Sequence, residues 1–181
     1  MKIGFLSDTH GNASSFEKAM QLMHDADIII HCGDVLPKYY GRLENDKEVQ
    51  ELAARIKKMD NIYLVKGNGD EKEHEEWLGH KFHSPALKLQ FGDYRIFASH
   101  GHYYSRMALL LKAQEEDCNI VCYGHTHVKE LDSDDKILVL NPGSVALPRD
   151  GSPSCAILEN NIMSIFHLDT GELIAQLPIP I

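Results

Sequence analysis

The sequence predicts a mixed β-sandwich with helices on its outer faces, and three observations support this fold class. In the first half, short apolar runs alternate with helical periods, as in a parallel sheet with helical crossovers. A Gly-Asp pair between two alternating runs is typical of an antiparallel hairpin. The last third consists of short apolar runs separated by turn sequences. Sheets covered by helices accommodate all three patterns.

The parallel part begins near the first residue. Its strands and helices are expected to alternate over residues 3–6, 14–24, 27–32, 46–59 and 61–65. In the second of these helices, Val49, Leu52 and Ile56 recur at intervals of three and four, which places them on one buried face. The acidic run over residues 70–76 then predicts a short solvated helix.

The second half is predicted to be mostly β. Strands over residues 86–91 and 94–99 are joined by Gly92-Asp93, a helix spans 105–116, and another strand follows at 120–123. Turn sequences at residues 133–135, 141–143, 159–161 and 169–171 divide the remainder into short strands. No repeat or linker divides the sequence, so residues 1–181 are expected to form a single domain.

The composition excludes several classes of protein. The chain is 43% hydrophobic and 25% charged, as soluble globular proteins are. Its formal net charge of -9 opposes binding of long nucleic acids, so any anionic substrate must be attracted locally. No apolar run reaches the length of a membrane span, and no leader precedes the first strand. No membrane partner is expected, and the expected location is the cytoplasm.

The cysteines are expected to be reduced and buried. Cys32, Cys118, Cys122 and Cys155 include no C-x-x-C pair, and three of them lie in apolar runs typical of core strands. A zinc-thiolate site at Cys118 and Cys122 is disfavoured, because no second pair completes the tetrahedron.

Side chains that bind metals follow five of the predicted strands at their carboxyl ends. These residues are Asp8, His10, Asp34, Asn68, His100, His125 and His127. In sheets with helical crossovers, the loops at this edge converge on one crevice. Glycines accompany four of the five segments and allow sharp turns close to a ligand. The five segments are therefore expected to meet at one site.

The ligand types are imidazole nitrogen, carboxylate oxygen and amide oxygen, without thiolate. This set suits Mn, Fe, Zn, Co or Ni. It suits Mg alone less well, because Mg prefers oxygen ligands and retained waters. Seven ligands are too many for one open zinc site but suit two metals that share a carboxylate. We expect two divalent ions, with Mn as the first choice.

The motifs at these positions resemble those of the calcineurin-like metallophosphoesterases. In the order of that family the chain has Asp8-Thr9-His10, Gly33-Asp34, Gly67-Asn68-Gly69-Asp70, His100-Gly101-His102, Gly124-His125-Thr126-His127 and finally Asn141-Pro142-Gly143-Ser144. The sequence is similar to the small bacterial and archaeal phosphodiesterase branch, the YfcE-like group, over nearly its whole length. The resemblance implies a four-layer αββα sandwich of two mixed sheets flanked by helices.

The resemblance also implies a role for each ligand. Asp8, His10 and His127 would hold the first metal, Asn68, His100 and His125 the second, and Asp34 would bridge them. Two such ions, about 3.5–4 Å apart, bind a bridging water and present hydroxide for in-line attack on phosphorus. They also stabilise charge on the phosphoryl oxygens. The expected activity is hydrolysis of small phosphodiesters, and the expected partner is a small phosphate-ester substrate.

One motif departs from the family pattern. Many members have a histidine after the metal-binding asparagine that contacts phosphate and assists the leaving group, and the branch commonly has a cysteine; this chain has Gly69. We take His102 as the substitute proton donor, because it lies two residues beyond His100. Asp70 is expected to orient His102 or a metal ligand. The predicted catalytic set is therefore Asp34, Asn68, His102 and Asp70.

The remaining polar and aromatic residues have weaker assignments. His31 is interpreted as a packed strand residue. The histidines that we expect to be structural or solvated are His24, His74, His80, His83 and His167. Side chains that are expected near the crevice, with a role in binding phosphate or a base left open, are Lys38, Arg42, Lys66, Tyr39-Tyr40 and Tyr103-Tyr104.

Two other functions stay open. A phosphomonoesterase or nucleotidase is the nearest alternative, although a diester needs fewer basic contacts than a dianion. The other alternative is a non-catalytic scaffold, since the resemblance extends to a retromer subunit that also lacks the histidine after the asparagine. The complete set of seven ligands favours an enzyme. The resemblance also leaves a homo-oligomer open.

Overall fold

The computed structural model describes residues 1–38 and 46–180. The strands are β1 (Lys2–Leu6), β2 (Ile28–His31), β3 (Ile62–Val65), β4 (Phe82–His83), β5 (Ala86–Phe91), β6 (Tyr94–Ser99), β7 (Ile120–Cys122), β8 (Glu130–Asp134), β9 (Ile137–Asn141), β10 (Ser154–Glu159), β11 (Ile162–His167) and β12 (Leu173–Pro178). The helices are α1 (Ala13–Leu22), α3 (Lys47–Ile56), α4 (His74–Leu78) and α5 (Arg106–Glu115).

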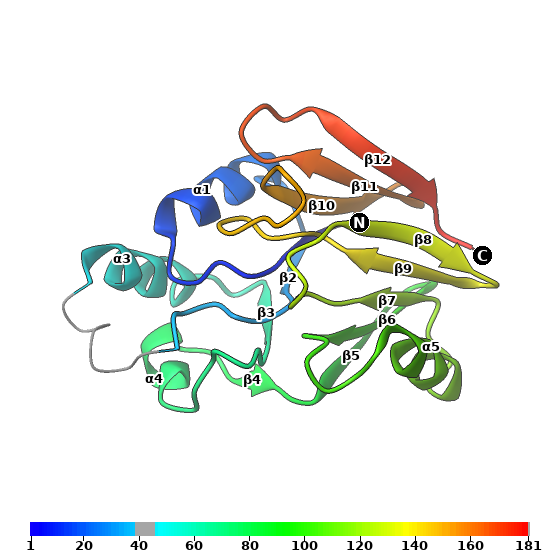
Figure 1. Cartoon of the computed structure of the whole chain (residues 1–181), viewed down its shortest axis with the longest axis horizontal. Coiled ribbons are helices and arrows are strands. Elements are labelled where there is room, and N and C mark those ends of the chain that lie inside the picture. Colours follow the sequence, from blue (N-terminus) through cyan, green and yellow to red (C-terminus); the bar gives the residue numbers. More distant parts are fainter. Residues whose placement is uncertain (39–45, 181) are drawn as a thin grey trace.

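The strands form two mixed sheets (Figure 1). The larger has the order β12-β11-β10-β1-β2-β3-β4, in which β1 to β4 are parallel and β10 to β12 extend the sheet in antiparallel fashion. The smaller has the order β5-β6-β7-β9-β8, in which β6, β7 and β9 are parallel and the two edge strands antiparallel. Both sheets therefore have several parallel strands that end at one edge.

Three hydrophobic cores separate four layers. Phe16 and Leu52 belong to the core between the larger sheet and the helices α1, α3 and α4. Phe5 and Leu138 belong to the core between the two sheets. Leu109 of α5 belongs to the third core, which lies between this helix and the outer face of the smaller sheet. The predicted four-layer sandwich of two mixed sheets with helices outside is confirmed.

Most predicted elements are present with shifted ends. The acidic run at residues 70–76 becomes helical only from His74, because the Asp70 carboxylate accepts hydrogen bonds from backbone groups of other loops and holds its segment outside the helix. The strand β8 continues through Asp134, so the turn occupies residues 135–136 and starts two residues later than predicted. The strand β4, which pairs with β3, was not predicted, because it has only two residues and these are too few to show an alternation of apolar and polar side chains. No helix in the described residues is long and apolar enough to cross a bilayer.

Candidate metal centre

The loops that follow β1, β2, β3, β6 and β7 carry the seven predicted ligands, and they meet at the carboxyl ends of these strands. Backbone hydrogen bonds join the first two loops: Asp8 N–H donates to Gly33 O, and His10 N–H donates to Asp34 O, each over 3.0 Å. The loops after β6 and β7 are joined in the same way. The predicted convergence of these loops at one edge is therefore present in the structure.

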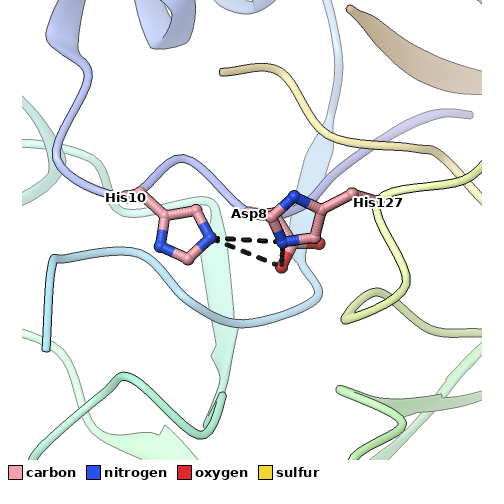
Figure 2. A group of neighbouring side chains, drawn as sticks. All are labelled: Asp8, His10 and His127. Atoms are coloured by element: carbon pink, nitrogen blue, oxygen red, sulfur yellow. Dashed lines mark hydrogen bonds and ion pairs between the residues drawn. The ribbon is translucent and has the colours of Figure 1, made fainter. Parts of the chain in front are cut away.

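Asp8, His10 and His127 point toward one another and form the first cluster (Figure 2). Asp8 Oδ1 lies 3.1 Å from His127 Nε2 and 3.9 Å from His10 Nε2, and the two Nε2 atoms are 3.3 Å apart. Asp8 is fully buried, and its Oδ1 accepts no hydrogen bond from the described residues. A buried carboxylate oxygen without a donor is costly, so these three side chains fit a cation.

The carboxylate of Asp34 lies between this cluster and a second one. Its Oδ2 is 3.8 Å from His10 Nε2, and its Oδ1 is 3.5 Å from His100 Nε2. The same His100 Nε2 lies 3.2 Å from Asn68 Oδ1, and the ring centroids of His100 and His125 are 5.1 Å apart. One oxygen of Asp34 therefore faces each cluster, which places this carboxylate where it could bridge two metal ions.

Two of the histidines have a fixed tautomer. His127 Nδ1 donates to Leu147 O, and His100 Nδ1 donates to Cys32 O, each over 2.7 Å. Because a carbonyl oxygen only accepts, Nδ1 carries the proton in both rings, and the Nε2 lone pair of the neutral ring is directed at the cluster. This arrangement is typical of histidines that bind metals.

The charges within the site agree with metal binding. Burial opposes ionisation of Asp34, but the protonated form of His100 and the Gly69 N–H outweigh it and lower the pKa of Asp34 to about 2. Asp34 and Asp8 in turn outweigh burial and raise the pKa of His100, so a cation at His100 Nε2, whether a proton or a metal ion, is favoured beside these carboxylates. Burial lowers the pKa of His10 and of His125, which favours the neutral imidazole that a metal needs. The residues present therefore fit divalent ions.

Five of the proposed ligands have a left-handed backbone. The φ angles are 56° for Asp8, 46° for His10, 54° for Asp34, 68° for His125 and 58° for His127. Such a conformation costs a non-glycine residue about 1 kcal/mol or more, and it concentrates at functional sites. The other non-glycine residues with positive φ in the described part of the chain are Asp117, Asp135, Asn160 and Asn161.

Comparison with known proteins identifies the family. The sequence pattern of the calcineurin-like phosphoesterase superfamily domain matches residues 1–161. The chain belongs to this superfamily. Phosphodiesterase MJ0936 of Methanocaldococcus jannaschii is 31% identical, and the alignment covers 88% of this chain and 93% of that protein. Phosphodiesterase YfcE of Escherichia coli is 28% identical, and the alignment covers 99% of this chain and 98% of that protein.

Solved structures give the same assignment. The structure of YfcE, described as a phosphoesterase from E. coli, has a TM-score of 0.84 at 26% identity and covers 99% of this chain and 100% of that one. Vps29 from Entamoeba histolytica, complexed with Zn, has a TM-score of 0.71 at 20% identity. The match covers 98% of this chain and 99% of Vps29. The likeness to Vps29 shows a common fold. The predicted resemblance to the calcineurin-like phosphoesterases is thus confirmed, and this family implies divalent metal ions.

In this calcineurin-like phosphoesterase, the Asp70 carboxylate holds the backbone of the loop that carries Asp34. Its Oδ2 accepts hydrogen bonds from Asp34 N–H at 2.8 Å and Gly67 N–H at 2.9 Å, and its Oδ1 accepts from Val35 N–H at 2.9 Å. Burial raises the pKa of Asp70 to about 6, although these N–H groups favour the carboxylate. Of its two predicted roles, this geometry supports orientation of a metal ligand.

His31 joins two ligand loops, a role that the sequence did not reveal. The side chain is fully buried, and burial lowers its pKa to about 3, so the ring is neutral. Its Nδ1 accepts from Gly33 N–H at 3.1 Å, and its Nε2 therefore donates to Thr9 Oγ1 at 2.7 Å. The available signal was a histidine that ends an apolar strand directly before the Cys-Gly-Asp motif.

The Asn-Pro-Gly-Ser motif supports the first cluster. Ser144 Oγ donates to Asp8 O at 2.8 Å and accepts from Leu147 N–H, also at 2.8 Å. Since the Leu147 carbonyl accepts from His127, this one hydroxyl connects the backbones beside two proposed ligands. The motif contributed to the predicted resemblance, but its role needed the structure.

His102 borders the second cluster. The centroid of its ring is 5.3 Å from that of His100 and 6.2 Å from that of His125. Burial and the neighbouring histidines lower its pKa, and its Nδ1 has no hydrogen-bond partner among the described residues. Three side chains that were predicted near the crevice lie outside the described residues, namely Tyr39, Tyr40 and Arg42.

Proposed function

We propose that this chain is a dinuclear metal-dependent phosphodiesterase that hydrolyses small phosphodiesters. The observation that carries the proposal is the position of Asp34, whose two carboxylate oxygens face two different histidines, His10 and His100. When bound, two divalent ions supply Lewis acidity and an activated water. The names of the two phosphodiesterase relatives support a diester as the substrate.

The proposed ligands divide into two sets. Asp8, His10 and His127 would hold one ion, Asn68, His100 and His125 would hold the other, and Asp34 would contact both. The donor set favours Mn, with Zn, Fe, Ni or Co as alternatives.

The burial of the ligands gives the direction of approach. Asp8 and His100 are fully buried, whereas Asn68 and His125 are exposed. The substrate therefore enters from the side of Asn68 and His125. The ring of His102 borders this side, which is where a group that protonates the leaving alcohol must lie.

Metal reconstitution tests the proposal. Protein stripped with a chelator receives Mn, Zn, Fe, Ni, Co or Mg separately, and hydrolysis of bis(p-nitrophenyl) phosphate is compared with that of p-nitrophenyl phosphate. We expect Mn to restore diester hydrolysis, and Asp34→Asn to abolish the response. Preference for the monoester would favour the phosphomonoesterase, whereas inactivity with every metal on both esters would favour the scaffold.

The role of His102 needs a second comparison. In His102→Ala, hydrolysis of a diester with an alkyl leaving group should fall much more than hydrolysis of a p-nitrophenyl diester, because p-nitrophenolate leaves without a proton. An equal loss with both leaving groups would exclude His102 as the proton donor.

A further inference from the structure

Exposed apolar side chains border the proposed metal centre. Val128 directly follows His127, and the carbonyl of Leu147 accepts the hydrogen bond from His127 Nδ1; both apolar side chains are exposed. Tyr103 lies three residues after His100 and is 59% exposed. Apolar side chains beside a polar centre are suited to the organic part of a ligand.

Tyr103 is connected to the centre through His102. The centroids of these two rings are 3.8 Å apart at an interplanar angle of 41°. The ring of His102 in turn lies 5.3 Å from that of His100. The rings therefore lead from a proposed ligand outward to an exposed aromatic side chain. Tyr104, in contrast, packs against the core beneath α5, so Tyr103 is the member of the pair that is available to a ligand.

We propose that Tyr103 and His102 form a subsite for a planar aromatic group of the substrate, so that the preferred diesters are those of nucleotides. This inference deepens the proposed function and rests on it. Every nucleobase has a flat face that stacks on an aromatic side chain. A ribose separates the base from its phosphate, so the base lies outward from the metal ligands, and the exposed Tyr103 beside His102 is available to it there.

A pair of probes isolates the base. Adenosine 5′-monophosphate and ribose 5-phosphate carry the same phosphate on the same sugar and differ in the base. We expect calorimetric titration of the Mn-loaded protein to show tighter binding of adenosine monophosphate by about 5- to 100-fold, the range for one stacked base. Tyr103→Ala should bring this ratio close to one without changing the affinity for ribose 5-phosphate. Tyr103→Phe should keep the ratio.

Leu111→Ala is the matched control. Leu111 is 53% exposed and lies within α5, outside the loop that carries Tyr103 and His102, so its removal should leave the ratio unchanged. A ratio near one in the unmodified protein, or one that Tyr103→Ala leaves intact, would overturn the subsite. So would a change of oligomeric state in both variants during sedimentation, because this face would then be an interface between copies.

The two proposals fail separately. Base-dependent binding that is lost in Tyr103→Ala, without hydrolysis of any ester, would support the subsite and reject the phosphodiesterase. Hydrolysis of diesters without base-dependent binding would support the enzyme and reject the subsite.

Discussion

Replacing Gly67 by alanine should damage the metal centre through one atom. A Cβ at this position would lie 2.1 Å from Asp34 Oδ1 and 2.2 Å from Asp34 N. Non-bonded carbon prefers separations of about 3.5–4.0 Å, so Asp34 must move by roughly 1 Å or more. The movement also disturbs the hydrogen bond from Asp34 N–H to the Asp70 carboxylate. Gly67→Ala therefore shifts the proposed bridging ligand without altering any ligand atom.

The cost of this substitution has two parts. Overpacking in a well-packed region costs about 1–3 kcal/mol. A weakened hydrogen bond to a charged group adds about 1.5–3 kcal/mol at most. We expect a loss of about 2–5 kcal/mol in the free energy of unfolding, which lowers Tm by roughly 5–20 °C for a chain of this size. Thermal denaturation of metal-free protein measures this loss, and calorimetric titration with Mn should show weaker binding of both ions.

Two other glycines supply the controls. A Cβ at Gly69 would lie 3.1 Å from the same Asp34 Oδ1, so Gly69→Ala should have the same effect in a smaller degree. Gly92 has a φ of 59° and nothing within 4 Å of an added Cβ, so Gly92→Ala should cost about 1–2 kcal/mol for backbone strain and leave metal binding intact. If Gly67→Ala binds Mn as tightly as Gly92→Ala does, the close approach to Asp34 has no functional consequence and the reasoning is wrong.

Three further predictions concern the ligands and their support. His31→Leu leaves Gly33 N–H and the Thr9 hydroxyl without their buried partner, so chemical denaturation should show a loss of about 2–6 kcal/mol; unchanged stability would contradict the role of His31. Asp34→Asn should weaken both ions together and His127→Ala mainly one, as read from stoichiometric titration; equal and independent losses would contradict the bridge. Chelation should lower Tm, and Mn at 100 times its Kd should restore about 2.7 kcal/mol; a Tm that ignores Mn would argue against a metal centre.

The fold was predictable where local pattern and burial agree. The predicted strands 86–91 and 94–99 match β5 and β6 at both ends, because alternation on each side of a tight turn fixes their register. The start of α4 was missed because Asp70 is held by Asp34 and Val35, which precede it by more than thirty residues. The spacing of apolar residues does not give the number of layers, so that prediction came from the resemblance to the family.

The candidate site was predictable in its members more than in its support. Residues of metal-binding type that follow predicted strands can be recognised in the sequence, because the carboxyl ends of parallel strands meet at one edge of a sheet. The supporting residues do not, because their function consists of distant contacts. His31 contacts Thr9, and Ser144 contacts Asp8, and each of these pairs is far apart in the sequence. A buried histidine in a strand has the same local sequence whether it packs or connects two loops.

The positive φ angles of five proposed ligands are held by contacts within the protein. Five such residues at about 1 kcal/mol or more each cost a sizeable share of the 5–15 kcal/mol that stabilises a typical domain. Hydrogen bonds within the protein offset this cost. The backbone N–H groups of Asp8 and His10 donate to the next loop, the Asp70 carboxylate accepts from the Asp34 N–H, and the Ser144 hydroxyl donates to Asp8 O. Because these contacts lie within the protein, a metal ion would not have to order the proposed ligands. Binding free energy that would otherwise fold the loops would then contribute to affinity.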